Sequence, residues 1–366
     1  MKRMFALTLS VALALLVAGC RSTPPVASAP AVEAGAAPFF EVIEAPRQPV
    51  IDRSHPDLAG NQFGFEGGHV IKQDGRYHLF TAEIVSEPFS AKTRLAHWSS
   101  PDGFAWRRVA TLYESSGRLD TNDTRFSLWS PIPIYNEREG RWNLFYIAYR
   151  PRGTTPAEVD HMDGRVWRAV SVKPGRAGLG GPYRDAGIVL QPDAASQPWE
   201  GQQGTASFHA WPVGGRWLAF YGSHNHIPRG PWRVGLAEAP ALAGPWVRCA
   251  DNPSPIEEHF IENPLVTRVG RPWVAIYDSS PVDAQGGYVP DGQHIGYAVS
   301  PDGRRWPVGR RLNLQPGDAN WSDDLRTPLS LIPEGGGVYT IFYTARLRGE
   351  LFWTVGIARV RLAAGR

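Results

Sequence analysis

Two glutamates occupy matching places in a repeated sequence pattern. Glu66 stands eleven residues before Tyr77 and Glu262 stands eleven residues before Trp273, and each aromatic residue opens a similar strand. If these positions meet at one cavity, partial burial raises the pKa of a carboxyl group, which can then act as an acid near neutral pH. Two carboxyl groups across one cavity are the minimum set for hydrolysis of a glycosidic bond.

The pattern that carries these glutamates occurs five times along the chain. Each copy has a glycine-containing turn and then a strand that opens on an aromatic residue. These strands read YHLFTA, WNLFYI, WLAFYG, WVAIYD and YTIFYT and begin at residues 77, 142, 217, 273 and 339. A short strand precedes each turn, and a third strand follows most of the hairpins. Five units of four antiparallel strands predict an all-β fold, a five-bladed β-propeller with a central channel, and a strand near residues 39–43 could complete the last blade.

In a propeller the innermost strand of each blade begins at the mouth of the channel, so side chains from all blades converge there. The inner strands are predicted to begin near residues 66, 130, 205, 262 and 327. From these strand heads, Trp129 offers a stacking face for a sugar ring, and Arg326 could bind a hydroxyl or carboxylate group. The further candidate substrate-binding residues are Ser130, Thr205, His209, Asn263, Asp323 and Asp324. The alternative is that charged residues at strand ends form solvated ion pairs with no further role.

The chain resembles the five-bladed β-propeller glycosidases, the superfamily of arabinanases, β-xylosidases, invertases and levansucrases, with glycoside hydrolase family 43 as the nearest pattern. The resemblance runs from about residue 60 to residue 360 and is carried by hairpins such as Gly75–Phe80 and by the strand head Ile261–Pro264. It implies that Glu262 is the general acid, and that Glu66 stands where the family has the aspartate that acts as base.

The resemblance also exposes a difference. The family's third carboxylate is an aspartate at an intermediate strand head, and the corresponding residues 129–132 and 204–206 include no carboxylate. Asp323 or Asp324 could replace it. Some relatives hold Ca²⁺ in the channel, so a channel Ca²⁺ is possible, although we predict no cofactor. His224 and His226 could also hold a metal, but no further ligand is close in sequence, and we predict no metal site.

Two functional hypotheses remain open from the sequence. One is an envelope-anchored glycoside hydrolase that acts on a poly- or oligosaccharide through Glu66 and Glu262. The other is a non-catalytic, lipid-anchored glycan-binding propeller of a polysaccharide-uptake system. The paired glutamates favour the first hypothesis, and the missing aspartate favours the second.

The first twenty residues predict export and lipidation. A basic start is followed by an apolar run over residues 5–18, which is too short for a comfortable membrane span. Val17–Cys20 then resembles the bacterial lipobox, and Arg21 in place of an aspartate favours the outer membrane over the inner. The predicted organisation is a signal peptide over 1–19, a lipidated Cys20 with a Pro/Ala-rich tether over 20–38, and the propeller domain over 39–366.

The composition agrees with a folded β-protein and argues against a polyanion partner. Of 366 residues, 38 are Lys or Arg and 35 are Asp or Glu, so the formal net charge is only +3 and nucleic acid is a poor candidate ligand. The 39 glycines, 33 prolines and 14 tryptophans favour many short strands joined by turns. We therefore expect a monomer whose partners are a carbohydrate and, through Cys20, a membrane.

Overall fold

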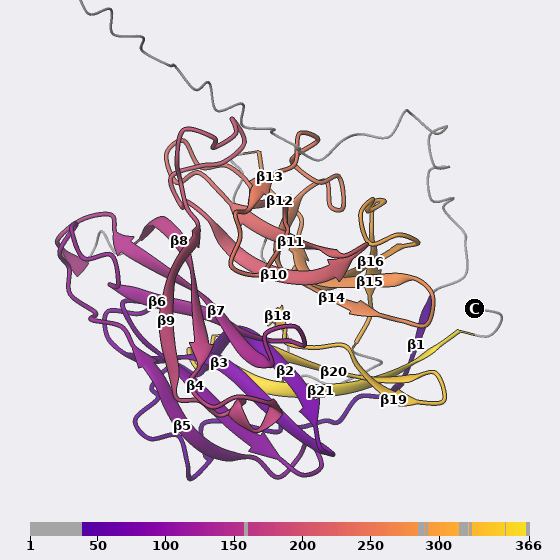
Figure 1. Ribbon diagram of the computed structural model, residues 1–366. Coiled ribbons are helices and arrows are strands. Elements are labelled where there is room, and N and C mark those ends of the chain that lie inside the picture. The colour runs from indigo at the N-terminus through magenta and orange to yellow at the C-terminus, as the bar shows by residue number, and fades with distance from the viewer. Residues whose placement is uncertain are drawn as a thin grey trace, which may run out of the picture.

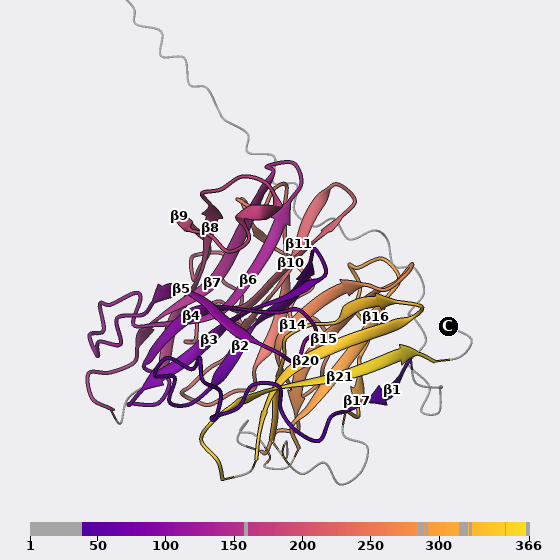
Figure 2. The ribbon, with the colours of Figure 1, turned by 90° about the horizontal axis from the view of Figure 1, so that it is seen from below.

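The computed structural model describes residues 39–156, 160–284, 289, 292–314, 321, 324–347 and 349–363, with the backbone alone at 325 and 326. Five antiparallel sheets follow one another around a central axis, as the colour change from indigo to yellow shows in Figures 1 and 2. The fold is the predicted five-bladed β-propeller. No α-helix lies in the described residues, where the short helical turn is the 3₁₀ segment Arg176–Gly178.

In blades 1 to 4 the strands of each sheet follow in chain order from the channel outward. Blade 1 contains β2 (Phe65–Gln73), β3 (Arg76–Ser86), β4 (Lys92–Ser100) and β5 (Arg107–Glu114). Blade 2 contains β6 (Ser127–Asn136), β7 (Arg141–Pro151), β8 (His161–Ser171) and β9 (Tyr183–Leu190). Blade 3 contains β10 (Ala206–Val213), β11 (Arg216–Ser223), β12 (Arg233–Ala239) and β13 (Val247–Arg248). Blade 4 contains β14 (Phe260–Arg268), β15 (Trp273–Ser280), β16 (His294–Ser300) and β17 (Arg310–Leu312).

Blade 5 joins the two ends of the chain. It contains β18 (Asp324–Pro328), β19 (Ile332–Gly335), β20 (Val338–Arg346), β21 (Thr354–Leu362) and β1 (Phe40–Glu44). Strand β1 pairs antiparallel with β21, and Phe40 lies opposite Leu362. The N-terminal strand therefore completes the last blade, as the sequence suggested.

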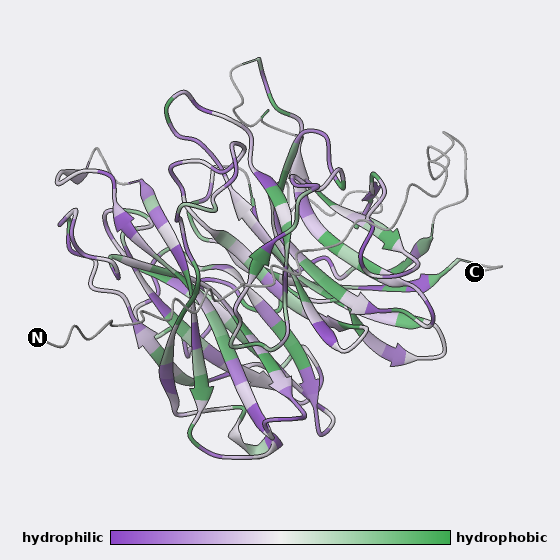
Figure 3. Cartoon of the chain, turned by 45° about the horizontal axis from the view of Figure 1, so that its top comes forward, coloured by the Kyte–Doolittle hydropathy of each residue, from purple (hydrophilic) through white to green (hydrophobic). Residues whose placement is uncertain are grey.

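Turn glycines and buried aromatic residues explain why the repeat folds into blades. The first hairpin turn of every blade has a glycine with positive φ, a conformation that L-residues with a Cβ rarely adopt. These glycines are Gly75, Gly140, Gly215, Gly270 and Gly337. The second strand of each blade is buried along most of its length because neighbouring blades pack on both of its faces. Figure 3 shows this pattern, with hydrophobic positions along the strands and hydrophilic ones mainly in the loops.

The predicted N-terminal features lie outside the described residues. Cys20, the signal peptide and the tether precede the first described residue. Within the residues that the structure describes, none of the helices has the length and apolar character needed to cross a bilayer.

Candidate active site

Every inner strand has a β-bulge at the same place, at its channel-mouth end. Pairing with the second strand of the blade shifts register between Glu66 and Gly68, Trp129 and Ile132, Ala206 and His209, Glu262 and Leu265, and Leu325 and Pro328. A bulge inserts one residue into one strand and re-aims the side chains beside it. In blades 1 to 4 the residue directly after the one that begins the bulge has a positive φ. The values are 62° at Gly67, 50° at Ser130, 49° at Ser207 and 47° at Asn263. Left-handed backbone at non-glycine residues is strained and clusters at functional sites.

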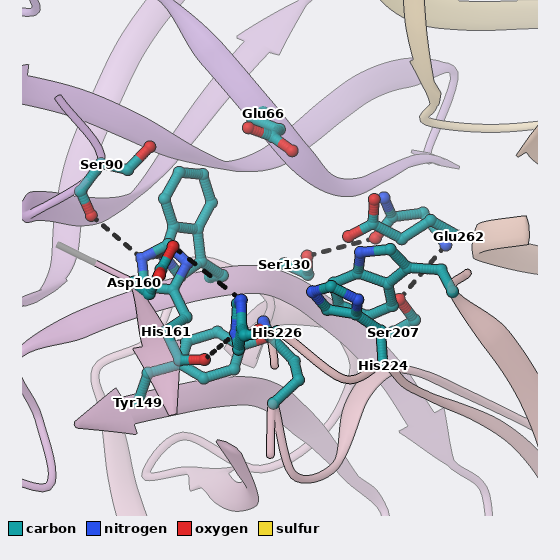
Figure 4. Close-up of a pocket in the computed structure, with 14 residues that line it drawn as sticks. Glu66, Ser90, Ser130, Tyr149, Asp160, His161, Ser207, His224, His226 and Glu262 are labelled. Atoms are coloured by element: carbon teal, nitrogen blue, oxygen red, sulfur yellow. Dashed lines mark hydrogen bonds and ion pairs between the residues drawn. The ribbon is translucent and has the colours of Figure 1, made fainter. Parts of the chain in front are cut away.

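The bulges of blades 1 to 4 contribute to one cavity of about 220 Å³ (Figure 4). The floor is formed by Glu66, Trp129, Ser130, Ser207, Glu262 and Asn263. The walls are formed by Ser90, Tyr149, Asp160, His161, Gln203, His224, His226 and Trp232. Glu66 belongs to blade 1 and Glu262 to blade 4, which are not adjacent in the ring, so the two carboxyl groups reach the cavity from different sides. Glu66 is only 8% exposed.

Hydrogen bonds between blades fix the floor of the cavity. The Ser130 hydroxyl of blade 2 lies 3.5 Å from Asn263 Oδ1 of blade 4. The backbone N–H of Asn263 donates to the Ser207 hydroxyl of blade 3 over 3.3 Å. Since Asn263 directly follows Glu262, these contacts hold the backbone that carries this carboxyl group.

Five predicted site residues therefore meet in the cavity, namely Glu66, Trp129, Ser130, Glu262 and Asn263. Thr205 does not: it is buried, and its hydroxyl donates to the carbonyl oxygen of Gly164 over 2.9 Å. Thr205 lies just before the bulge of β10, and a bulge re-aims the side chains beside it, so the alternation of faces does not continue from Thr205 to Ser207. Ser207 is the residue of this strand that lines the cavity.

Two more predicted residues lie away from the cavity, and two cannot be placed. His209 is deeper in the channel, where its ring lies 5.4 Å from that of His69 and its Nδ1 accepts a hydrogen bond from the backbone N–H of Val266. Asp324 forms an ion pair with Arg346, with 2.8 Å between Oδ2 and Nε. Asp323 and the side chain of Arg326 lie outside the described part of the chain.

The site also contains residues that the repeat pattern did not indicate. Asp160 comes from the connection between β7 and β8, His161 opens β8, and His224 and His226 come from the connection between β11 and β12. These connections differ in length between blades, so aligning the repeats could not place them. The spacing of His224 and His226 was the available signal; it was weighed as a metal site, and no metal site was predicted from it.

Burial changes the protonation behaviour of two cavity residues. It raises the pKa of Tyr149, and the nearby charges of Glu262 and Glu66 raise it further. Burial lowers the pKa of His224 to about 4, so this imidazole is neutral at pH 7. Its Nδ1 donates to the carbonyl oxygen of Gly230 over 2.9 Å, and its ring stacks on Trp232 with 5.1 Å between centroids.

The side chains that follow the five bulges offer no oxygen ligand for Ca²⁺. The residues that follow the bulges are His69 and His209, whose pKa values are lowered by burial, and the apolar Ile132, Leu265 and Pro328. Ca²⁺ takes six to eight oxygen ligands, from carboxylates, carbonyl groups or water, and none of these five side chains carries an oxygen. Among the described residues, no group of three or more His, Cys, Asp or Glu side chains could hold a metal ion.

The fold recurs in solved structures, although no protein-family model matches the sequence. The curated proteins likewise contain no match. A glycoside hydrolase structure aligns with a TM-score of 0.61 at 15% identity, over 90% of this chain and 93% of that one. A thermostable family-43 glycoside hydrolase aligns with a TM-score of 0.55 at 16% identity, over 84% of this chain and 93% of the other. A family 117 glycoside hydrolase from the marine bacterium Zobellia galactanivorans aligns with a TM-score of 0.56 at 15% identity, over 88% of this chain and 89% of the other.

The chain has the five-bladed β-propeller fold of these glycoside hydrolases. The likeness covers most of the length of both partners in each pair, so no large domain of these relatives is left unmatched. At this level of identity the shared feature is the fold, and the function must be argued from the cavity itself.

Proposed function

We propose that the protein is a glycoside hydrolase that acts on a poly- or oligosaccharide, with Glu262 as general acid and Glu66 as base or nucleophile. The observation that carries this proposal is the placement of both glutamates. They occupy the same bulge position in blades 1 and 4, which are not neighbours, and both line one cavity. The glycoside hydrolases that share the fold support the same reaction class.

In the proposed reaction, Glu262 donates a proton to the glycosidic oxygen as its bond to the anomeric carbon breaks. Glu66 either takes a proton from the attacking water or attacks the anomeric carbon itself, in which case water cleaves the intermediate in a second step. Trp129 and Trp232 line the cavity and offer apolar faces for the sugar ring. Nε1 of Trp129 donates to the Ser127 hydroxyl, which fixes the indole in place.

The test is hydrolysis of aryl glycosides and of plant and algal oligosaccharides by wild type, Glu66→Gln and Glu262→Gln. Each substitution keeps the side-chain shape and should lower kcat/KM by about 10²–10⁴-fold, the usual contribution of a general acid or base. Glu262→Gln should spare aryl glycosides with good leaving groups more than oligosaccharides, because such leaving groups need less protonation.

A matched control is Glu139→Gln, since this carboxylate pairs with Arg168 over 2.9 Å and does not line the cavity. Activity within about threefold of wild type in both cavity variants would remove the glutamates from the mechanism. A wild-type protein that binds oligosaccharides and cleaves none would establish the glycan-binding hypothesis instead.

We further propose that the mature chain is anchored in the bacterial cell envelope through lipid on Cys20, with the outer membrane favoured. The support is the lipobox-like Val17–Cys20 and the Pro/Ala-rich segment that separates it from the propeller. Membrane fractionation of wild type and Cys20→Ala tests this, with the variant expected in the soluble fraction. Equal distribution of the two proteins would contradict the proposal.

A further inference from the structure

One wall of the cavity presents an imidazole whose tautomer the structure defines. His226 Nε2 lies 2.9 Å from the carbonyl oxygen of His161 and 2.8 Å from Gln203 Oε1. Both partners are acceptors, so Nε2 carries the proton. In the neutral ring Nδ1 is then an acceptor with a lone pair. Figure 4 shows this imidazole beside His161 and Asp160 at the cavity wall.

Asp160 brings a second acceptor to the same wall. Its Oδ2 forms an ion pair with Arg152 Nε over 2.8 Å, which orients the carboxylate. Its Oδ1 lies 3.9 Å from His226 Nδ1. This distance is too long for a hydrogen bond, and two lone pairs do not bond to each other while the imidazole is neutral. Both atoms therefore suit a ligand that supplies two donors.

The loop that carries His226 is held in place before any ligand binds. The backbone N–H of Gln202 donates to Asn225 Oδ1 over 3.0 Å, and the backbone N–H of Ile227 donates to Gln202 Oε1 over 3.1 Å. These bonds flank His226 on both sides. A site whose groups are already oriented loses little conformational entropy when it binds.

We propose that Asp160 and His226 form a subsite for two neighbouring hydroxyl groups of one sugar ring. One hydroxyl donates to Asp160 Oδ1 and the other donates to His226 Nδ1. The subsite favours sugars with a vicinal diol over ring deoxy analogues, which leave His226 Nδ1 or the part-exposed Asp160 carboxylate without its sugar donor. The inference deepens the proposed function, because it takes the cavity to be the place where the sugar binds.

Binding without turnover tests the subsite. The probes are methyl α-L-arabinofuranoside, methyl β-D-xylopyranoside and methyl β-D-galactopyranoside, each compared with its monodeoxy analogues. Trp129 and Trp232 line the cavity, so quenching of tryptophan fluorescence reports binding, and calorimetry checks it. Asp160→Ala and His226→Leu should each weaken the best-bound diol sugar about tenfold. Each variant should leave unchanged the affinity for the deoxy analogue that lacks the hydroxyl group which the substituted residue would bind.

Asp185→Asn is the matched control, because this carboxylate pairs with Arg125 over 3.1 Å in the same blade and does not line the cavity. Asp160→Asn provides a milder variant if Asp160→Ala fails to fold. Equal losses for parent and deoxy sugars would overturn the subsite, as would unchanged binding in the variants or no binding of any probe by wild type. Binding through these residues in a protein that hydrolyses no glycoside would refute the proposed function and keep the subsite. Glycoside hydrolysis by a protein whose sugar affinity neither variant changes would keep the proposed function and overturn the subsite.

Discussion

Burial alters the titration of several histidines. Burial lowers the pKa of His69 and His224 to about 4 and that of His97 to about 3. The ring of His97 stacks on Phe80 with 4.5 Å between centroids. A charged imidazole there would lose its hydration, so these rings stay neutral at pH 7 and act through packing and lone pairs.

This burial makes stability depend on pH. An unfolded histidine has a pKa near the model value of 6.5, so between pH 6.5 and 4 the unfolded chain binds protons that the folded chain does not. The free energy of unfolding should therefore fall as pH falls through this window, by up to about 1.4 kcal/mol per pH unit for each such histidine. Urea melts at pH 7, 6 and 5 measure the slope. His97→Phe keeps a flat ring and should reduce the slope by one histidine, so an unchanged slope would exclude His97 as a contributor.

At the scale of the element, the bulged inner strand builds the site. In blade 1 the bulge consists of glycines, and Gly68 has φ of 119°. A Cβ on Gly68 would lie 1.9 Å from the carbonyl oxygen of Phe80 on the neighbouring strand. The close approach of the two backbones explains why position 68, two residues after Glu66, needs glycine.

Two glycine substitutions separate this close approach from the cost of positive φ. Gly75 has φ of 79°, but a Cβ there meets no atom within 4 Å. Gly75→Ala should cost about 1 kcal/mol of unfolding free energy from backbone strain alone. Gly68→Ala should cost at least about 2 kcal/mol more, because backbone must shift, and should also lower activity by displacing Glu66. Thermal melts and kcat/KM of both variants give the comparison, and equal costs would show that the contact with Phe80 relaxes freely.

At the scale of the whole molecule, pairing of the two chain ends closes the ring. Phe40 of β1 is 3% exposed, and its ring lies 5.5 Å from that of Tyr297 in blade 4 and 5.9 Å from that of Tyr339 in blade 5. The first strand therefore joins the last blade to the blade before it. A side chain in this position stabilises the closed ring and not only its own sheet.

Phe40→Ala should lower the free energy of unfolding by about 3–5 kcal/mol, the usual cost of removing a buried aromatic ring. Ile43 lies on the same strand and is 44% exposed, so Ile43→Ala should change stability by less than about 1 kcal/mol. Denaturant melts of both variants test the difference. Similar small effects in the two variants would mean that β1 adds little to closure.

The repeated part of the sequence determined the architecture and five of the fourteen residues that line the cavity. A glycine turn followed by an aromatic strand encodes a hairpin locally, and five copies can bury their faces only by packing into a ring. The same alignment identified Glu66, Trp129, Ser130, Glu262 and Asn263, since equivalent strand heads in a ring face one channel.

The tertiary structure alone decided the rest. The bulges break the alternation of faces, so Ser207 and not Thr205 reaches the cavity. His209 lies below it, and Asp324 turns to Arg346. Asp160 and His226 belong to connections without a repeat, 66 residues apart in the chain, and only the packing of blade 2 against blade 3 brings them together. A local pattern fixes the strands, but the side chains that loops contribute depend on contacts between blades that no local pattern contains.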